Sequence, residues 1–419
     1  MKIAIVTSSF YPVIDGVTVA VYNRLRYLSK SGHKVLVFAP DYGSLKEMYP
    51  NWQDYTGEIL PKVTVISLAS KPSLALDFER DVTSNSYKLV AAKLHEFQPD
   101  IIHVDEAERL SFCFLNKPGV RYAKKNQIPS VAFFHTNYLE YLDDYFRLPW
   151  KLLRPIKASL QKLFVNIYNS YDATLVSSRI TYTKLSSLGI KNLCYGEFLG
   201  LDLGSYQKVE SNINFWQKNY HTPDLNALVK LIFVGRLTPD KGWDFFLQGV
   251  KQLSPETMDK LAFIVVGDGE YKEKIQKQLG ALTTHLYMLG RVSPKNIPSL
   301  LVNSDLFVTN SEKETRGLAV MEASAAGIPT IAPKAGGIVD TIVDGENGLL
   351  YQPQQIEDFV AKLNLLVSVR ELRTAMGAKA TDKVAELDWQ CTTARLVRIW
   401  QQQIEQKSLC KPVTPKPFG

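Results

Sequence analysis

The sequence predicts an α/β protein made of two doubly wound, Rossmann-like domains. Short β-branched runs recur along the chain, each followed by a turn signal and then by apolar residues at helical spacing, which is typical of parallel βαβ units. These units form two series separated by a polar stretch. The length of 419 residues agrees with two or three domains, because one domain takes roughly 100 to 200 residues.

The first series occupies residues 1–205. A strand is expected at Lys2–Val6, and the apolar spacing after Asp15 predicts a helix that ends before Gly32, a residue suited to the position just past a helix. Further strands are expected at Val35–Phe38, Ile101–Val104, Val131–Phe134 and Thr174–Val176.

The second series occupies residues 227–387 and follows a polar linker at 206–226. A helix at 388–406 is expected to cross back to the first domain, and residues 407–419 to form a loose tail. Two such domains would face a cleft, and open α/β sheets bind ligands beyond the carboxyl ends of their strands, so a site is expected on the strand-to-helix loops. Strands of this series are expected at Leu231–Val234, Phe263–Val266, Leu286–Leu289, Leu306–Val308 and Thr330–Ala332.

The composition excludes several classes of protein. Hydrophobic residues make up 45% and charged residues 22%, the balance of an ordinary soluble globular protein. The 49 Lys and Arg exceed the 42 Asp and Glu by 7, which favours anionic ligands or surfaces but not nucleic acid. Neither a signal-peptide core nor a membrane-spanning run is present, so we expect a cytoplasmic protein whose membrane contact is peripheral. The four scattered cysteines indicate neither a disulfide framework nor a metal site.

The loop after the first strand, FYPVIDGV, places Gly16 at the entry to a helix. Backbone amides at a helix N-terminus suit anions, and a glycine lets a phosphate approach closely. The same glycine would serve a tight turn equally well, so both roles remain open for Gly16.

The loop FVGRLTPDKGW follows the first strand of the second series. Arg236 and Lys241 lie beyond the carboxyl end of this strand, where a guanidinium and an ammonium could together hold a diphosphate. A surface ion pair is the alternative. The predicted position of both cations beside a cleft favours the diphosphate.

The stretch TNSEKETRGLAVMEASAAGIPTIAPKAGG is the most informative part of the chain. Glu314 lies on the loop after Leu306–Val308, and Glu322, eight positions later, falls on a helix that begins near Leu318. One carboxylate can accept hydrogen bonds from sugar hydroxyls and the other can reach a ribose, while the amides from Gly317 to Ala319 can meet a phosphate. Either glutamate alone would be interpreted as a solvated surface carboxylate, but together they fit a nucleotide sugar.

The combination of these motifs resembles the retaining GT-B glycosyltransferases of family 4. The spacing Glu314-x7-Glu322, with GRLTPDKG upstream and GGIVDTIVDGENGLL downstream, carries the resemblance, which covers nearly the whole chain. It implies a GT-B fold with the first domain on the acceptor side. It also implies that Arg236 and Lys241 hold the donor diphosphate, that Glu314 holds the sugar hydroxyls and that Glu322 holds the ribose.

The resemblance also indicates the rest of the donor site. Arg316 departs from the family pattern, in which Phe is common after Glu-Thr, so contacts near the donor sugar are expected to differ in this chain. The further residues expected to bind the donor are Gly16, Gly235, Gly317, Leu318 and Ala319.

Two histidines end strands of the first domain, His135 in VAFFHTNYLEYL and His103 in DIIHVDEAERL. A histidine at a strand end can donate to a sugar hydroxyl or a phosphate oxygen. The resemblance favours donor contact for His135, whereas an acceptor-side role and a core role remain equally open for His103. The runs HTNYLEY, DEAERL and FVNIYNSY further resemble the digalactosyldiacylglycerol synthases of oxygenic phototrophs, which implies transfer from UDP-galactose to the galactose of a monogalactosyl lipid.

A lipid acceptor requires a membrane-facing surface. The segment LPWKLLRPIKASLQKLFVNIY mixes aromatic, aliphatic and cationic residues, as an interfacial helix on an anionic membrane does. The candidates for membrane contact are Trp150, Lys151, Arg154 and Lys157. The alternative is a core helix with the apolar stripe Ile156, Leu160, Leu163 and Ile167.

Catalysis is expected to be electrostatic and positional, without a cofactor. No Ser-His-Asp arrangement, metal-binding cluster or close carboxylate pair can be assigned in the sequence, and the resemblance implies retention of configuration and no metal. The expected catalytic residues are His135, Arg236, Lys241 and Glu314. The alternatives are a family 4 hexosyltransferase acting on another glycolipid or a polysaccharide, a GT-B epimerase, and a non-catalytic nucleotide-sugar-binding homologue.

Overall fold

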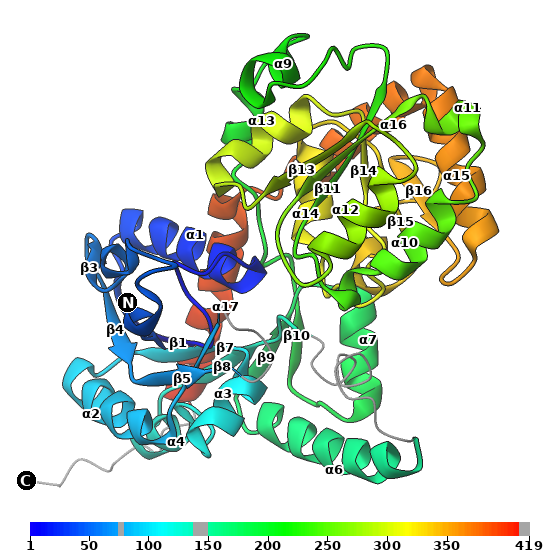
Figure 1. Cartoon of the computed structure of the whole chain (residues 1–419). Helices are drawn as coiled ribbons and strands as arrows, with labels where there is room; N and C mark the ends of the chain where they lie inside the picture. Colours follow the sequence, from blue (N-terminus) through cyan, green and yellow to red (C-terminus); the bar gives the residue numbers. More distant parts are fainter. Residues whose placement is uncertain (74–78, 137–149, 410–419) are drawn as a thin grey trace, which may run out of the picture. The chain divides into compact units, whose positions relative to one another are not determined.

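The computed structural model describes residues 1–73, 79–136 and 150–409, and for residues 150–156 the backbone alone. These residues form two compact units. The first contains the described residues up to Gly200 together with Trp389–Leu409, and the second contains Leu201–Asp388. Both units are Rossmann-like α/β domains with parallel sheets, as the sequence predicts (Figure 1).

The first unit has ten strands among its described residues: β1 (Lys2–Thr7), β2 (Lys34–Pro40), β3 (Gly57–Leu60), β4 (Val63–Leu68), β5 (Ser70–Pro72), β6 (Arg80–Val82), β7 (Ile101–Asp105), β8 (Ser130–Phe133), β9 (Ala173–Val176) and β10 (Leu193–Tyr195). Eight of them form one sheet in the order β10-β9-β8-β7-β1-β2-β4-β3. All neighbours in this sheet run parallel except β3 and β4. Strands β5 and β6 form a separate antiparallel pair.

Helices cover both faces of this sheet. Apolar side chains of α2, α3, α4 and the C-terminal part of α6 share one core with the strands, while α17 lies beside α1 in the same unit (Figure 1). The helix α17 therefore belongs to the first unit, although it comes last in the sequence. The helices of this unit are α1 (Gly16–Lys30), α2 (Tyr87–Phe97), α3 (Ala107–Phe114), α4 (Val120–Asn126), α6 (Trp150–Tyr168), α7 (Arg179–Leu188) and α17 (Trp389–Leu409).

The second unit has six parallel strands in the order β13-β12-β11-β14-β15-β16. The strands are β11 (Val229–Val234), β12 (Leu261–Val266), β13 (Leu286–Gly290), β14 (Leu306–Val308), β15 (Thr330–Pro333) and β16 (Gly348–Tyr351). The helices are α8 (Leu203–Gln207), α9 (Phe215–Tyr220), α10 (Trp243–Val250), α11 (Pro255–Met258), α12 (Lys272–Gly280), α13 (Ile297–Val302), α14 (Leu318–Ala325), α15 (Ile356–Ser368) and α16 (Arg370–Val384).

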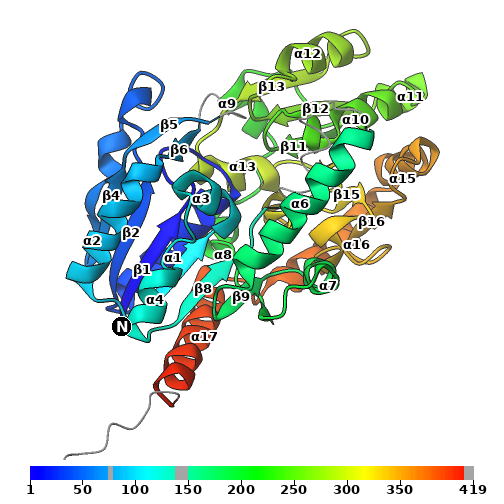
Figure 2. The same ribbon diagram turned by 90° about the horizontal axis from the view of Figure 1, so that it is seen from below.

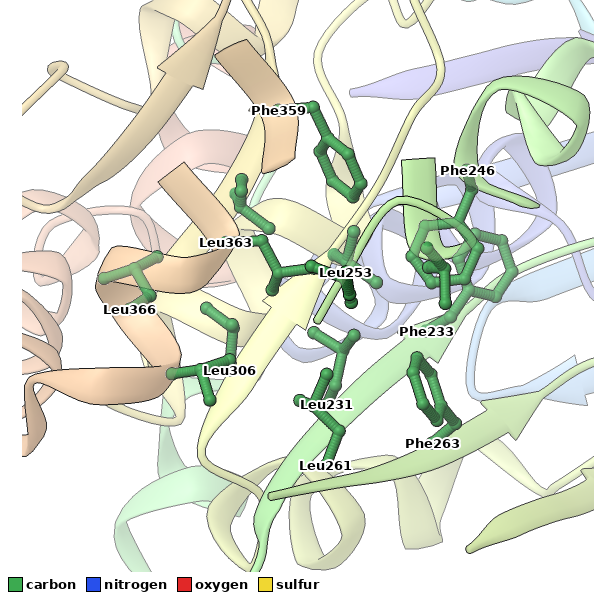
Figure 3. Close-up of a cluster of buried hydrophobic side chains, with 14 of the residues drawn as sticks. Leu231, Phe233, Phe246, Leu253, Leu261, Phe263, Leu306, Phe359, Leu363 and Leu366 are labelled. Carbon is green, nitrogen blue, oxygen red and sulfur yellow. The ribbon is translucent and has the colours of Figure 1, made fainter. Parts of the chain in front are cut away.

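The sheet of the second unit is buried on both faces. On one face, α10, α12 and α15 pack against alternate residues of the central strands. Figure 3 shows leucine and phenylalanine side chains of α10, α15 and these strands meeting in one apolar layer. On the other face lie α8, α9, α13 and α14, and two views show the same division (Figures 1 and 2). Burial on both faces explains why these strands are almost wholly apolar.

The segment 206–226, which we expected to be a linker, is packed against the second unit. Tyr206, Trp216 and Leu225 are buried in the core cluster on the α13 and α14 face. The indole N–H of Trp216 donates to the carbonyl oxygen of Asn303 at 2.7 Å, which fixes the segment to the end of α13. The segment is mostly polar, so these few buried apolar residues do not stand out in the sequence, which predicts a linker.

Each sheet has a point where the strand order reverses. In the first unit β1 lies between β2 and β7, and in the second β11 lies between β12 and β14. Loops that leave the carboxyl ends of two such neighbouring strands diverge, and doubly wound sheets bind their ligands there. A ligand-binding site is therefore expected at the loops after β1, β7, β11 and β14.

Candidate functional site

The loops after β11 and β14 meet through an ion pair. Nζ of Lys241 lies 2.6 Å from Oε1 of Glu314, so the predicted diphosphate cation and the predicted sugar carboxylate are in contact. Asp240 lies between the cations, with Oδ2 at 3.7 Å from Nζ of Lys241 and from Nη2 of Arg236. Arg236 keeps 31% of its side chain exposed and Lys241 14%, so both can meet a ligand.

Glycines allow these loops to touch. Gly242 adopts a φ of +70°, and a Cβ there would lie 2.2 Å from the carbonyl oxygen of Asn310, so the backbones after β11 and β14 are in direct contact. A Cβ on Gly337 would lie 2.0 Å from the carbonyl oxygen of Thr315, and its N–H donates to the carbonyl oxygen of Glu314 at 2.7 Å. Any larger residue at either glycine would push the loop that carries Glu314 out of place.

The helix α14 follows this loop directly. Gly317, with a φ of +75°, turns the chain into the helix, so the amides of Leu318 and Ala319 lie in its first turn, where N–H groups have no intrahelical acceptor. Glu322 lies one turn further along, and burial raises its pKa to about 7. Within the described part of the chain, its carboxylate has no hydrogen-bond or ion-pair partner.

The unusual residue Arg316 is only 3% exposed. It therefore places a permanent charge inside the loop between Glu314 and Gly317, where the family pattern has an apolar ring. Gly235, at the end of β11, has a φ of +156°, and its carbonyl oxygen lies so close to Gly267 that a Cβ there would be 1.8 Å away. The first turn of the loop after β11 is thus fixed by close backbone packing.

In the first unit, the carboxyl end of β7 holds a buried charge centre. Asp105 is fully buried and accepts from Nη1 of Arg24 at 3.0 Å, while Nε2 of His135 lies 2.6 Å from its Oδ1. Burial by itself would raise the pKa of Asp105, but the charge of Arg24 and the hydrogen bond with His135 hold it well below its usual range. Asp105 therefore stays ionised and binds His135 as an anion.

His103 takes a core role rather than an acceptor-side one. Its ring is fully buried, Nε2 lies 2.8 Å from Nη1 of Arg24, and the ring packs edge-on against Trp400 of α17 at 5.3 Å. Burial lowers its pKa to about 4, so the ring is neutral. Of the two histidines that end strands, only His135 reaches the edge of the sheet.

A second carboxylate lies beside this centre. Glu106 is 2% exposed and has a φ of +57°, a conformation that costs a non-glycine residue energy. Its carboxylate accepts hydrogen bonds from the hydroxyls of Ser8, after β1, and Thr136, after β8. Glu106 therefore connects, through hydrogen bonds, the loops that follow β1, β7 and β8 at one edge of the sheet.

The helix α1 begins at Gly16, as predicted, but its N-terminus already carries a negative group. Asp15 is the N-cap and accepts from the N–H of Thr18 at 2.7 Å and from the hydroxyl of Ser9 at 3.0 Å. A carboxylate at this position competes with a phosphate, which favours the tight-turn role of Gly16.

The predicted membrane segment forms helix α6, of which the C-terminal part is core. Phe164, Ile167 and Tyr168 are buried, whereas Leu163 is 43% exposed, so Ile167 agrees with the stripe expected from the sequence and Leu163 departs from it. Lys157 lies on the described part of the helix. The side chains of Trp150, Lys151 and Arg154 lie outside the described residues.

The described residues contain neither a candidate metal site nor a membrane-spanning helix. Across residues 1–73, 79–136 and 150–409, no three His, Cys, Asp or Glu side chains are arranged to hold a metal ion. In the same ranges, no helix has the length and apolar character needed to cross a bilayer.

Two protein families match the chain, one in each unit. The family described as "Glycosyltransferase Family 4" matches residues 14–193, and the family described as "Glycosyl transferases group 1" matches residues 226–383. The chain is a GT-B glycosyltransferase of the group 1/family 4 type.

Known relatives and a solved structure match this glycosyltransferase over most of its length. It is 26% identical to the GDP-mannose-dependent alpha-mannosyltransferase of Corynebacterium glutamicum, over 95% of this chain and 88% of that relative. It is 26% identical to the alpha-monoglucosyldiacylglycerol synthase of Acholeplasma laidlawii, over 85% of this chain and 86% of that relative. The crystal structure of Anabaena Alr3699/HepE in complex with UDP has the same fold, with a TM-score of 0.72 at 18% identity over 96% of this chain and all of that one.

The sequence patterns miss part of the glycosyltransferase's polar centre in the first unit. Asp105, Arg24 and Glu106 were not singled out, although Asp105 and Glu106 open the run DEAERL. An acidic pair directly beyond a buried strand indicates such a centre, since residues at this position lie where ligands bind. Nothing local to α1 marks Arg24 as its partner.

Proposed function

We propose that this glycosyltransferase transfers galactose from UDP-galactose to monogalactosyldiacylglycerol, giving digalactosyldiacylglycerol, with retention of configuration and without a metal ion. The observation that supports a nucleotide-sugar donor is the contact between Lys241 and Glu314. It joins a phosphate-binding cation to a hydroxyl-binding carboxylate, beyond the point where the strand order of the sheet reverses. The acceptor half is supported by the runs HTNYLEY, DEAERL and FVNIYNSY. The name of the A. laidlawii relative supports a diacylglycerol-based acceptor.

The donor-binding roles follow from the chemistry of each group. Arg236 and Lys241 hold the diphosphate, and Glu314 accepts from hydroxyls of the hexose. Glu322, which has no protein partner in the described ranges, accepts from both ribose hydroxyls. The backbone of Gly235 and the N–H groups of Gly317, Leu318 and Ala319 complete the phosphate side.

The reaction moves one hexose between two oxygens. The bond from C1 of the sugar to the diphosphate oxygen breaks, the bond from C1 to the acceptor oxygen forms on the same face, and the acceptor proton passes to a phosphate oxygen of the donor. Negative charge grows on the departing UDP, so Arg236 and Lys241 stabilise the transition state more than the ground state. Glu314 and His135 hold the sugar in the reactive orientation.

A lipid acceptor implies peripheral association with an anionic membrane surface on the cytoplasmic side. Residues 1–200 with 389–419 contain 29 Lys and Arg against 19 Asp and Glu, an excess of 10, whereas residues 201–388 contain 20 against 23. The positive charge of the chain therefore resides on the first unit, which also carries α6 and its exposed Leu163. Cations beside exposed apolar groups are the composition of a membrane-docking surface.

A family 4 hexosyltransferase with another donor or another acceptor, such as a different glycolipid or a polysaccharide, is the second candidate. The similarity to a GDP-mannose-dependent mannosyltransferase, at the same 26% identity as the glycolipid synthase, favours it. The two candidates differ in the nucleotide and the hexose that they consume.

One assay separates the candidates. The full-length protein is incubated, with and without EDTA, with UDP-galactose, UDP-glucose or GDP-mannose and with vesicles that contain diacylglycerol or monogalactosyldiacylglycerol. We expect a digalactosyl lipid from UDP-galactose and the monogalactosyl lipid alone, unaffected by EDTA, with an α-linkage by NMR. Consumption of GDP-mannose, or transfer from UDP-glucose at an equal rate, would overturn the assignment.

A further inference from the structure

The protons around Asp105 can be assigned from the donors that surround it. A guanidinium only donates, so in the 2.8 Å contact between Arg24 and His103 the ring nitrogen Nε2 of His103 is the acceptor. Nε2 of His103 also lies 3.2 Å from Oδ1 of Asp105, but a ring nitrogen that accepts from Arg24 cannot donate to this carboxylate, which leaves Arg24 and His135 as its donors among these four residues. Asp105 is ionised and accepts only, so Nε2 of His135 must carry a proton.

We propose that Asp105 is a positioning residue that keeps a proton on Nε2 of His135, so that in the uncharged ring Nδ1 can only accept a hydrogen bond, as from a hydroxyl of the bound sugar. This inference deepens the proposed function and rests on it for the role of His135. The identity of the ring nitrogen that donates decides which partner a histidine can bind. With Arg24 and Asp105 in place, a hydroxyl that meets Nδ1 has to donate, as a sugar hydroxyl can and an ester phosphate oxygen cannot.

The neighbouring residues reinforce this arrangement. Asp105 and Glu106, consecutive at the end of β7, hold His135 and Thr136, consecutive at the end of β8, through their carboxylates. The backbone N–H of Glu106 donates to the carbonyl oxygen of Phe133 at 3.1 Å, so the register of the two strands continues into the loop. His135 also lies against the Phe133 ring at 4.1 Å. The imidazole is thus fixed in position as well as in protonation.

The direct test is a measurement of the His135 tautomer. Two-bond ¹H–¹⁵N spectra of histidine-labelled protein at alkaline pH, where imidazoles are neutral, distinguish Nε2–H from Nδ1–H. The chain has six histidines, and the signal lost in His135→Gln assigns the ring. We expect Nε2–H in the unmodified protein, and Nδ1–H would overturn the proposal. This readout requires neither a substrate nor a variant of Asp105 that folds.

The variant Asp105→Asn adds a functional readout. Arg24 can only donate, so it takes the amide oxygen, and the amide NH₂ group then faces His135 and forces its proton to Nδ1. We expect this tautomer change, a loss of about 10- to 100-fold in turnover, and an unchanged affinity for UDP. Asp100→Asn is the matched control, since Asp100 precedes the same strand at its other end and accepts only from the N–H of Lys2.

A double variant separates the two proposals. If Asp105 acts through His135, Asp105→Asn lowers the turnover of His135→Ala no further. An additive loss would overturn the positioning role. Full activity of His135→Ala would instead overturn the proposed contact of His135 with the sugar, whatever the tautomer is.

Discussion

The two units share one sheet plan but differ in what lies at its carboxyl edge. In the second unit, Lys241 and Arg236 are partly exposed and held on loops that glycines bring together. In the first unit, Arg24 and Asp105 are almost completely buried and neutralise each other. This difference in exposure agrees with the proposed roles, in which the cations of the second unit meet a charged ligand and the pair in the first unit orients another side chain.

Burial raises the pKa of two carboxyl groups, one in each unit, but only one of them has partners that oppose the rise. Glu322 has no cationic partner among the described residues, so burial raises its pKa to about 7. Asp105 is fully buried, yet Arg24 and His135 hold its pKa well below the usual range. The presence of a partner thus decides whether a carboxyl group removed from water has a raised or a lowered pKa.

The largest effect is expected at the donor cations. Lys241→Ala should lower turnover by about 100- to 1000-fold and UDP affinity by about 10-fold, because charge on the leaving group grows in the transition state. Arg236→Ala should act in the same direction. Steady-state kinetics and calorimetry with UDP check this, with Lys260→Ala, an exposed lysine paired to Glu256, as control. Unchanged kinetics in both variants would remove the cations from the site.

The excess of positive charge on the first unit predicts the next largest effect, a loss of binding to anionic membranes. Neutralising Lys151, Arg154 and Lys157 together should weaken binding to anionic vesicles by about 3 kcal/mol at low salt, since each cation near such a surface contributes about 1 kcal/mol. Donor hydrolysis without acceptor should barely change. Vesicle co-sedimentation at low and high salt is the measurement, because the effect fades with screening. Co-sedimentation equal to that of the parent would move the docking surface away from α6.

The sequence predicts most of the central strands, for a physical reason. A parallel strand covered on both faces, such as Leu261–Val266, has only apolar residues, and the candidate site residues of the second unit lie within short motifs. The Arg24–Asp105 pair spans 81 positions and leaves no local pattern. The short strand β16 (Gly348–Tyr351) sits inside a glycine-rich motif, so it was not distinguished as a strand.

Two glutamates of the second unit are expected to differ in their effects. Glu314→Gln should lower transfer by about 10- to 100-fold with little change in UDP affinity, because its proposed partner is the sugar. Glu322→Gln should weaken both transfer and UDP affinity, because its proposed partner is the ribose of the nucleotide. Parallel measurement of UDP affinity and turnover checks the assignment, and a UDP affinity that depends mainly on Glu314 would reverse it.

A buried glutamate of the first unit predicts a pH effect on stability. Burial, aided by the charge of Glu106, raises the pKa of Glu108 to about 8. The folded state keeps this proton while the unfolded state loses it above its ordinary pKa, so the stabilisation is present at low pH and is lost as pH rises toward 8. The free energy of unfolding of the parent should therefore fall between pH 5 and pH 8 by about 1 to 2 kcal/mol more than that of Glu108→Gln. Urea unfolding at both pH values tests this, with the exposed Glu96→Gln as control.

The smallest effect is a pH dependence of donor binding. With a pKa of about 7, Glu322 gains a proton as pH falls, and a protonated carboxyl accepts less well from ribose hydroxyls. Affinity for UDP-galactose should rise about 3- to 10-fold from pH 6 to pH 8, and this rise should vanish in Glu322→Gln. UDP-galactose is preferable to UDP because its diphosphate diester does not titrate in this range. An equal rise in the variant would assign the dependence to another group.

The division of labour between the units is tested most directly by the affinity of the full-length protein for UDP in two variants. Calorimetry of Lys241→Ala and Asp105→Asn, both first shown to be folded, needs no knowledge of the acceptor. We expect Lys241→Ala to weaken UDP binding about 10-fold and Asp105→Asn to leave it unchanged. A normal affinity in Lys241→Ala together with a loss in Asp105→Asn would contradict the assignment of the nucleotide to the second unit.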